Sequence, residues 1–181
     1  AIALNGSTIY IVWHQTTVSK QELFYAKSSD NGDTWTAPLQ LSEGNNSNSK
    51  WPSIAVEGDN IYVVFGDDRI SSQYEVYFKN SSDGGKTWSI DKRLTNYVAG
   101  TDAPDGIAVN GSNVHLLFSR FPWEEYYMNS PDGGQTWNAP VMISTAGFIS
   151  EAGNIAVNGS NIHIGWSDYN ASNAEIYYRH S

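Results

Sequence analysis

Short apolar runs alternate with polar turns along the chain, and the same alternation returns four times. Each period opens with Ile-Ala-Leu or Ile-Ala-Val, continues through an Asn-Gly-Ser or Glu-Gly-Asp turn, and enters a run such as Ile-Tyr-Val-Val-Phe. The periods start at Ile2, Ile54, Ile107 and Ile155. Runs of β-branched and aromatic residues joined by such turns predict antiparallel hairpins. Each period therefore begins with two paired strands, A and B.

Two further strands are expected in each period. An aromatic run opened by glutamate predicts strand C, starting at Glu22, Glu75, Glu124 and Glu175. In the first three periods the stretch after the next tryptophan predicts strand D. No useful length of sequence shows the 3.6-residue period of a helix. Because four strands in about fifty residues are typical of a propeller blade, the sequence predicts an all-β propeller of four-stranded antiparallel blades.

The four periods predict one propeller domain, or a fragment of one, over residues 1–181. Its blades are expected at about residues 1–48, 49–100, 101–148 and 149–181. The fourth period stops at Ser181, where the other three continue into strand D, so the last blade is expected to lack its outer strand. An unpaired strand C offers its backbone to another chain, which makes self-association through this blade a second expectation.

The turn between strands C and D is nearly the same in three periods, beginning at Ser28, Ser81 and Ser130. An Asp side chain accepts hydrogen bonds from amides further along the turn, Gly adopts the positive φ that closes it, and Trp can bury its ring against the blade. The residues in these roles are Asp30, Gly32 and Trp35, then Asp83, Gly85 and Trp88, then Asp132, Gly134 and Trp137. A motif repeated at nearly even spacing is expected to serve the blade and not a single active site.

The spacing S-x-D-x-G-x-T-W resembles the Asp-box, or bacterial neuraminidase repeat, of the sialidase-like propellers. All three copies match it at every fixed position, and the flanking strands repeat as well, so the resemblance covers nearly the whole chain. It implies that the turn lies on the outer part of the blade, away from the substrate face. It also implies one of two functions: a non-catalytic module that binds glycans or proteins or acts as a structural repeat, or part of a sialidase-like glycoside hydrolase.

Several sialidase features are not recognisable in this chain. The resemblance implies an arginine triad, a Tyr nucleophile with a Glu partner, an Asp acid, and a Phe/Tyr-Arg-Ile-Pro motif before the first box. That motif is missing, and the sequences around Arg69 and Arg120 are partial matches in other blades. A sialidase head also has six blades, more than this length supplies. We therefore favour the non-catalytic module and predict no catalytic residue, with the hydrolase as the alternative.

Segments that differ between periods are the places where a site can be added to the repeat. These are the B–C loops and the D–A connections, which lie on the propeller face opposite the C–D turns. Arginine pairs with carboxylates and aromatic rings stack on sugars, so such residues suit a sugar or an acidic glycan, although ordinary surface contacts are an open alternative. The candidate ligand-binding residues are Asp67, Asp68, Arg69, Arg120, Trp123, Asp168 and Tyr169.

The composition of the chain limits the classes of partner that it is expected to bind. The net charge of -9 argues against nucleic acid and anionic membranes, and no apolar run is long enough for a transmembrane helix. No close group of His, Cys and carboxylates is found, so neither a metal nor a cofactor is expected. An extracellular or cell-surface location is expected mostly from the family resemblance. Six Asn-x-Ser triplets are a weaker indication, because three of them, at Asn5, Asn110 and Asn158, also suit the A–B hairpin turn for its backbone alone. The six triplets begin at Asn5, Asn45, Asn80, Asn110, Asn158 and Asn170.

Overall fold

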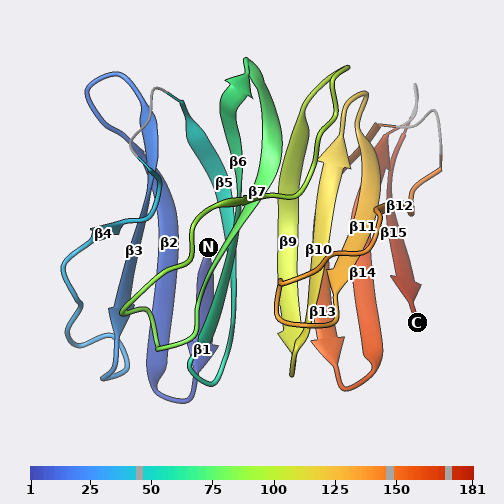
Figure 1. Cartoon of the computed structure of the whole chain (residues 1–181). Coiled ribbons are helices and arrows are strands. Elements are labelled where there is room, and N and C mark those ends of the chain that lie inside the picture. The colour runs from blue at the N-terminus through green and yellow to red at the C-terminus, as the bar shows by residue number, and fades with distance from the viewer. Residues whose placement is uncertain (44–46, 146–148, 170–172) are drawn as a thin grey trace.

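A computed structural model describes residues 1–43, 47–145, 149–169 and 173–181. Two of the Asn-x-Ser triplets, at Asn45 and Asn170, begin outside these ranges. The described residues form four antiparallel sheets that stand side by side as blades (Figure 1), and they contain no helix, hence none that could cross a membrane. The predicted all-β propeller is therefore confirmed.

Within each sheet the strands follow chain order. Blade one contains β1 (Ile2–Asn5), β2 (Thr8–Thr16), β3 (Gln21–Ser28) and β4 (Leu39–Gln40). Blade two contains β5 (Ser49–Glu57), β6 (Asn60–Ser71), β7 (Gln73–Ser81) and β8 (Lys92–Arg93). Blade three contains β9 (Asp102–Asn110), β10 (Asn113–Arg120), β11 (Glu124–Ser130) and β12 (Val141–Met142).

Blade four is shorter than the others. It contains β13 (Ile149–Asn158), β14 (Asn161–Tyr169) and β15 (Ala174–His180), and the described part of the chain adds no fourth strand to it. The predicted short last blade is therefore confirmed. Its outer strand is open to solvent, since Ile176 of β15 is 83% exposed and Tyr178 is 59% exposed.

The hydrophobic core lies between the faces of neighbouring blades. In β6, Val63 packs towards blade one and the next residue, Val64, packs towards blade three. In β10, Leu116 faces blade two and Leu117 faces blade four. Successive side chains of a strand point to opposite faces, so these two strands are buried on both sides. Each such aliphatic side chain contributes about 1.5 to 3 kcal/mol by its burial.

The three C–D turns make the same hydrogen bonds. In the second turn, the Ser81 hydroxyl donates to Asp83 Oδ1 (2.8 Å) and accepts from the amide of Gly85 (2.9 Å). The amide and hydroxyl of Thr87 donate to the two oxygens of Asp83 (2.9 and 2.6 Å). Asp30 and Asp132 have the same partners in their own turns. One aspartate thus closes each turn.

These turns also join neighbouring blades. The Trp88 ring lies edge-on to Tyr25 of blade one (5.1 Å between ring centres), and Trp137 lies in the same way against Phe78 of blade two (5.3 Å). A Cβ atom at Gly134 would collide with the Phe78 ring. Glycine is therefore required there both for its positive φ and for the close approach of the neighbouring blade.

Candidate functional site

Strand A carries a β-bulge at corresponding heights in blades two, three and four. The pairing of strands A and B skips residues 51–52 in β5, residue 105 in β9 and residues 152–153 in β13. A bulge breaks the regular alternation of a strand and redirects the side chains beside it. Residues from all three bulges, Pro52, Asp105 and Gly153, line one open pocket.

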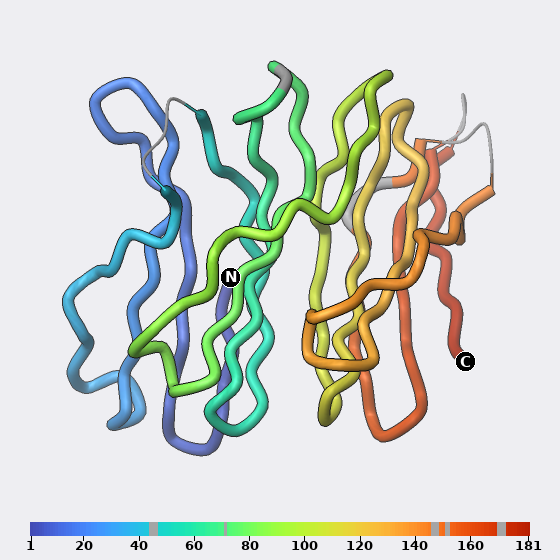
Figure 2. The backbone as a smooth tube through the Cα atoms, viewed as in Figure 1, coloured from blue at the N-terminus to red at the C-terminus, as the bar shows by residue number. Residues whose placement is uncertain are grey.

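The bulges that line this pocket lie near the start of each strand A, and so towards the end of the blades that carries the B–C loops. The backbone in Figure 2 shows these loops at the opposite end from the A–B and C–D turns. The volume of the pocket is about 580 Å³, within the range of about 300 to 1,000 Å³ that is usual for small-molecule sites. Neither Lys nor Arg is among its described lining residues. That lining consists of Trp51, Pro52, Ala103, Pro104, Asp105, Ser119, Trp123 and Gly153.

Both tryptophans of the pocket have a left-handed backbone. The φ angle is 51° at Trp51 and 85° at Trp123. A bulky residue in this region costs about 1 to 3 kcal/mol, and such strain is concentrated at binding and active sites. Trp123 is held by two backbone hydrogen bonds of 2.6 Å, one to the carbonyl of Arg120 and one from the amide of Ser150. The Trp51 ring packs edge-on against Tyr74 at 4.7 Å.

A group of acidic side chains lies behind the pocket. The Ser119 hydroxyl donates to Asp105 Oδ2 (2.6 Å) and lies 3.4 Å from Glu125 Oε2. Glu125 is fully buried, and its Oε1 atom has no hydrogen-bond partner among the described residues. A Cβ at Gly153 would collide with that carboxyl group, so glycine makes room for it. Burial, followed by the charges of Asp105 and Asp168, raises the pKa of Glu125 to about 9, which keeps the group neutral at pH 7.

Glu125 was absent from the sequence-based candidates. The equivalent position of strand C holds Leu23, Val76 and Ile176 in the other blades, so blade three places an acid where its relatives place an aliphatic side chain. That internal difference is the signal that identifies Glu125. Glu124, the residue before it, matches the glutamate that opens strand C in every period, so a search for the repeated glutamate finds Glu124 and not Glu125.

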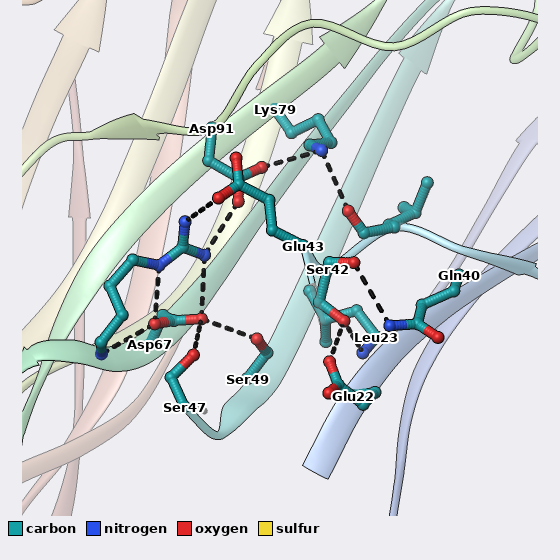
Figure 3. Close-up of polar contacts among 12 residues, drawn as sticks. Glu22, Leu23, Gln40, Ser42, Glu43, Ser47, Ser49, Asp67, Lys79 and Asp91 are labelled. Atoms are coloured by element: carbon teal, nitrogen blue, oxygen red, sulfur yellow. Dashed lines mark hydrogen bonds and ion pairs between the residues drawn. The ribbon is translucent and has the colours of Figure 1, made fainter. Parts of the chain in front are cut away.

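The candidates Asp67 and Arg69 belong to a separate ion-pair network (Figure 3). Arg69 lies 2.8 Å from Asp67, 2.8 Å from Asp91 and 3.0 Å from Glu43, and Asp67 also accepts a hydrogen bond from Ser49 (2.7 Å). Burial lowers the pKa of Arg69, but its contacts with Asp67 and Asp91 outweigh this and raise it. The guanidinium group is thus directed at carboxylates of its own chain, and neither candidate lines the pocket.

Three of the candidates occupy one repeated position. Facing residues of strands A and B form a polar pair near the B–C end of blades two, three and four. The pairs are Ser49 with Asp67 (2.7 Å), Asp102 with Arg120 (2.8 Å to each of two nitrogens) and Ser150 with Asp168 (2.5 Å). Blade three has the acid on strand A in place of strand B. A pair that recurs in this way stabilises the ends of the blades, and it also sets Asp168 close to Glu125.

The remaining candidates are divided between the pocket and its surroundings. Asp68 accepts hydrogen bonds from the amide and the side chain of Asn48 (2.7 and 2.9 Å). Tyr169 ends β14 and is 43% exposed. Trp123 is the one sequence-based candidate in the described lining of the pocket. The pocket therefore combines Trp123 with residues that sequence reasoning did not select, of which Trp51 and Asp105 carry the most distinctive chemistry.

Comparisons with known proteins identify the fold. No protein-family model and no curated protein sequence matches the chain. Among solved structures, the Hadza microbial sialidase Hz136 is 12% identical with a TM-score of 0.70, and the Trypanosoma rangeli sialidase is 15% identical with a TM-score of 0.69. A polysaccharide lyase of family PL25, an ulvan lyase, is 16% identical with a TM-score of 0.67.

These structures are considerably longer than the chain. The similarity covers 97%, 98% and 100% of this chain but 42%, 35% and 52% of the three proteins, in the order given. The chain thus spans about half of their length or less. At such low identity the similarity shows the fold alone, which is that of a β-propeller.

Proposed function

We propose that the chain is a glycan-binding propeller module and that the pocket between Trp51 and Trp123 holds the sugar. The observation that carries this proposal is the presence of two indoles, both on strained backbone, beside the carboxylate of Asp105. An indole face packs against the apolar face of a pyranose, and a carboxylate accepts hydrogen bonds from its hydroxyl groups. Strain that is maintained at two lining residues supports a role in binding.

We further propose that the module is non-catalytic. Glycoside hydrolysis requires two carboxyl groups that both reach the scissile bond. Asp105 lines the pocket, but Glu125 is fully buried behind it. The neutral Glu125 carboxyl is better suited to supporting the wall of the pocket than to transferring a proton to a ligand. In addition, Arg69 and Arg120 are engaged by carboxylates of the chain, which disfavours a role in binding a substrate carboxylate.

A sialidase-like glycoside hydrolase is the second candidate function. The observation in its favour is an acid of raised pKa next to an aspartate, an arrangement that hydrolases use for a general acid and its partner. We expect no turnover of a fluorogenic sialoside by the chain. Turnover that disappears in Arg69→Ala or Arg120→Ala, with the melting temperature unchanged, would favour the hydrolase instead.

The remaining parts of the proposal concern the turns, the location and the partners. We assign the three C–D turns as Asp-boxes whose role is to link blades, and we place the protein outside the cell or at its surface.

The open strand β15, with Ile176 and Tyr178 exposed, supports self-association through blade four. Tyr178→Pro removes a backbone donor that β15 turns away from β14 and should weaken such association in sedimentation experiments. A monomer at every concentration would contradict it.

The glycan proposal can be tested with three tryptophan variants. Trp51→Ala and Trp123→Ala should remove retention on glycan-containing affinity gels. Trp35→Ala is a matched control, because Trp35 is 43% exposed and Trp51 is 41% exposed, but Trp35 lies in a C–D turn at the opposite end. The control should bind as the parent does. Equal loss of binding in all three folded variants would overturn the proposal, as would the absence of binding by the parent to any glycan tested.

A further inference from the structure

A second, smaller pocket adjoins the first at Trp123. Its volume is about 280 Å³, and its lining residues are Gln73, Ala99, Gly100, Thr101, Phe121 and Trp123. Trp123 therefore lines both pockets. A ligand with several linked units can contact Trp123 from both pockets, whereas a single sugar occupies one pocket only.

The second pocket also has an aromatic wall that is open to solvent. Phe121 is 48% exposed and lies edge-on to Trp123, with 6.1 Å between the ring centres. A Cβ atom at Gly100 would lie 2.9 Å from the Phe121 Cβ, so glycine allows the ring to lie against the D–A connection. Trp51, Trp123 and Phe121 thus provide three aromatic contacts over two adjoining pockets. Stacking on successive rings is a sequence-tolerant way to hold a chain of planar or flat-faced units.

The charge of this surface distinguishes between classes of glycan. The described lining of the two pockets contains the carboxylate of Asp105 and neither Lys nor Arg. The nearest arginine in sequence, Arg120, makes two hydrogen bonds to Asp102 and stacks on Tyr97 and Tyr126 at 4.6 and 4.7 Å. A uronate, sialate or sulfate group would therefore meet like charge at the described lining of the two pockets. The nearby Lys50 ammonium group is not among these lining residues and is held over the rings of Trp51 and Tyr74, at 5.7 and 4.9 Å from the ring centres. Neutral sugar hydroxyls would find the acceptor oxygens of Asp105 and the hydroxyls of Ser119 and Thr101.

We propose that the two pockets together bind a neutral polysaccharide, with at least one sugar unit in each pocket and Trp123 between the two. The inference rests on the proposed glycan-binding function and adds to it both the charge class and the minimum length of the ligand. Trp51 holds the unit in the larger pocket, Phe121 holds the unit in the smaller one, and Trp123 contacts both.

Affinity electrophoresis and calorimetry can test the charge class. The probes are xyloglucan, galactomannan and mixed-linkage β-glucan as neutral chains, together with homogalacturonan in its methyl-esterified and de-esterified forms. The last two share a backbone and differ in charge. We expect binding to at least one neutral chain, and no binding to de-esterified homogalacturonan even where the esterified form binds. Preference for the acidic form would overturn this inference and leave the proposed function intact.

A length series tests the number of sugar units. Calorimetry is performed with the oligosaccharides of the neutral chain that binds best, from one unit to six. Affinity should rise by about tenfold or more between one unit and three, because the second pocket adds a further aromatic contact. Phe121→Ala should remove this rise, and Trp51→Ala should weaken binding at every length. Melting curves of both variants verify that they fold.

The outcomes separate the two proposals. Affinity that is independent of length, or a length dependence unchanged in Phe121→Ala, would overturn the two-pocket inference alone. Failure of the parent to bind any of the neutral or acidic probes would overturn the proposed function, and this inference with it.

Discussion

The two ends of the propeller differ in how closely their residues repeat from blade to blade. At the C–D end, Asp30, Asp83 and Asp132 close three turns with one set of hydrogen bonds. At the B–C end, the bulges present different residues in each blade, including Trp51 and Asp105. A contact that is useful in every blade is repeated, whereas a single pocket requires each blade to supply something different.

The difference extends to the backbone. Positive φ falls on glycine at most positions of the C–D turns, where it costs little. At the B–C end it falls on Trp51 and Trp123, where it is unfavourable. The buried acid Glu125 is also at this end, beside the pocket. Unfavourable backbone conformations and a buried acid with an oxygen unpartnered among the described residues are thus concentrated at the end that carries the proposed site.

Gly134→Ala should be the most destabilising change. It forces a side chain into φ of 90° and into the Phe78 ring of the neighbouring blade. We expect the free energy of unfolding to fall by about 3 kcal/mol, the sum of overpacking and left-handed strain. Urea denaturation measures it.

Gly32→Ala is the matched control at the equivalent position of blade one. Its φ is 100°, but the nearest atom to an added Cβ is Ile9 Cδ1 at 3.5 Å, an ordinary contact. This variant should lose about 1 kcal/mol from backbone strain alone. Equal losses in the two glycine variants would show that the turns do not depend on contact between blades.

Glu125→Gln tests the buried acid at the other end. Because the folded pKa of Glu125 is raised to about 9, the folded state holds a proton that the unfolded state releases above about pH 4.5. Stability is therefore greatest below the unfolded pKa and falls as the pH rises towards 9, by at most about 1.4 kcal/mol per pH unit.

The glutamine variant has no such proton to lose. It should be more stable than the parent by about 1 to 3 kcal/mol at pH 8 and should equal it near pH 4. Thermal melts over this pH range measure both curves. If the stability of the two proteins depended on pH in the same way, Glu125 would not be the group that lowers the stability of the parent at high pH.

These tests also separate what the sequence predicts from what it does not. The strands, the hairpins and the C–D turns follow from local patterns, because runs such as Ile61–Phe65 and turns around Asp83 encode their own conformation. The pocket depends on contacts between blades. A bulge at Asp105 is a matter of register, and the burial of Glu125 depends on Gly153 in the next blade, so neither is visible within one period.

The charged candidate residues also show that a prediction made from one period misses contacts between distant residues. Asp67, Arg120 and Asp168 occupy B–C segments that differ in sequence, which made them plausible ligand contacts. Each is paired across strands A and B with Ser49, Asp102 or Ser150, and these partners are about eighteen residues away. The recurrence is hidden because blade three exchanges the acid between strands.

Asp132→Ala should destabilise the protein without affecting the proposed pocket. Hydrogen bonds from Thr136 and Ser130 lower the pKa of Asp132 to about 2. A lowered folded pKa means that this contribution is present above the unfolded value near 4 and is lost as the pH falls towards 2.

The melting temperature of Asp132→Ala should therefore be lower than that of the parent by several degrees at pH 7, and the difference should shrink near pH 2. Glycan affinity of the folded variant should be unchanged, because the turn lies at the opposite end from the pocket. Loss of affinity with unaltered melting would assign the turn to the site and contradict the division between the two ends.

The smallest effect on stability is expected from Trp51→Gly, compared with Trp51→Ala. Both variants lose the indole and its contact with Tyr74, so both should lose glycan binding. They differ in the backbone: alanine retains the strain of a φ near 51°, whereas glycine adopts this φ freely. Trp51→Gly should therefore be more stable than Trp51→Ala by about 1 kcal/mol, the reverse of the order expected in a regular strand. Urea denaturation measures the free energy of unfolding of the two variants. If Trp51→Ala were the more stable, the backbone at position 51 would not be strained, contrary to this prediction.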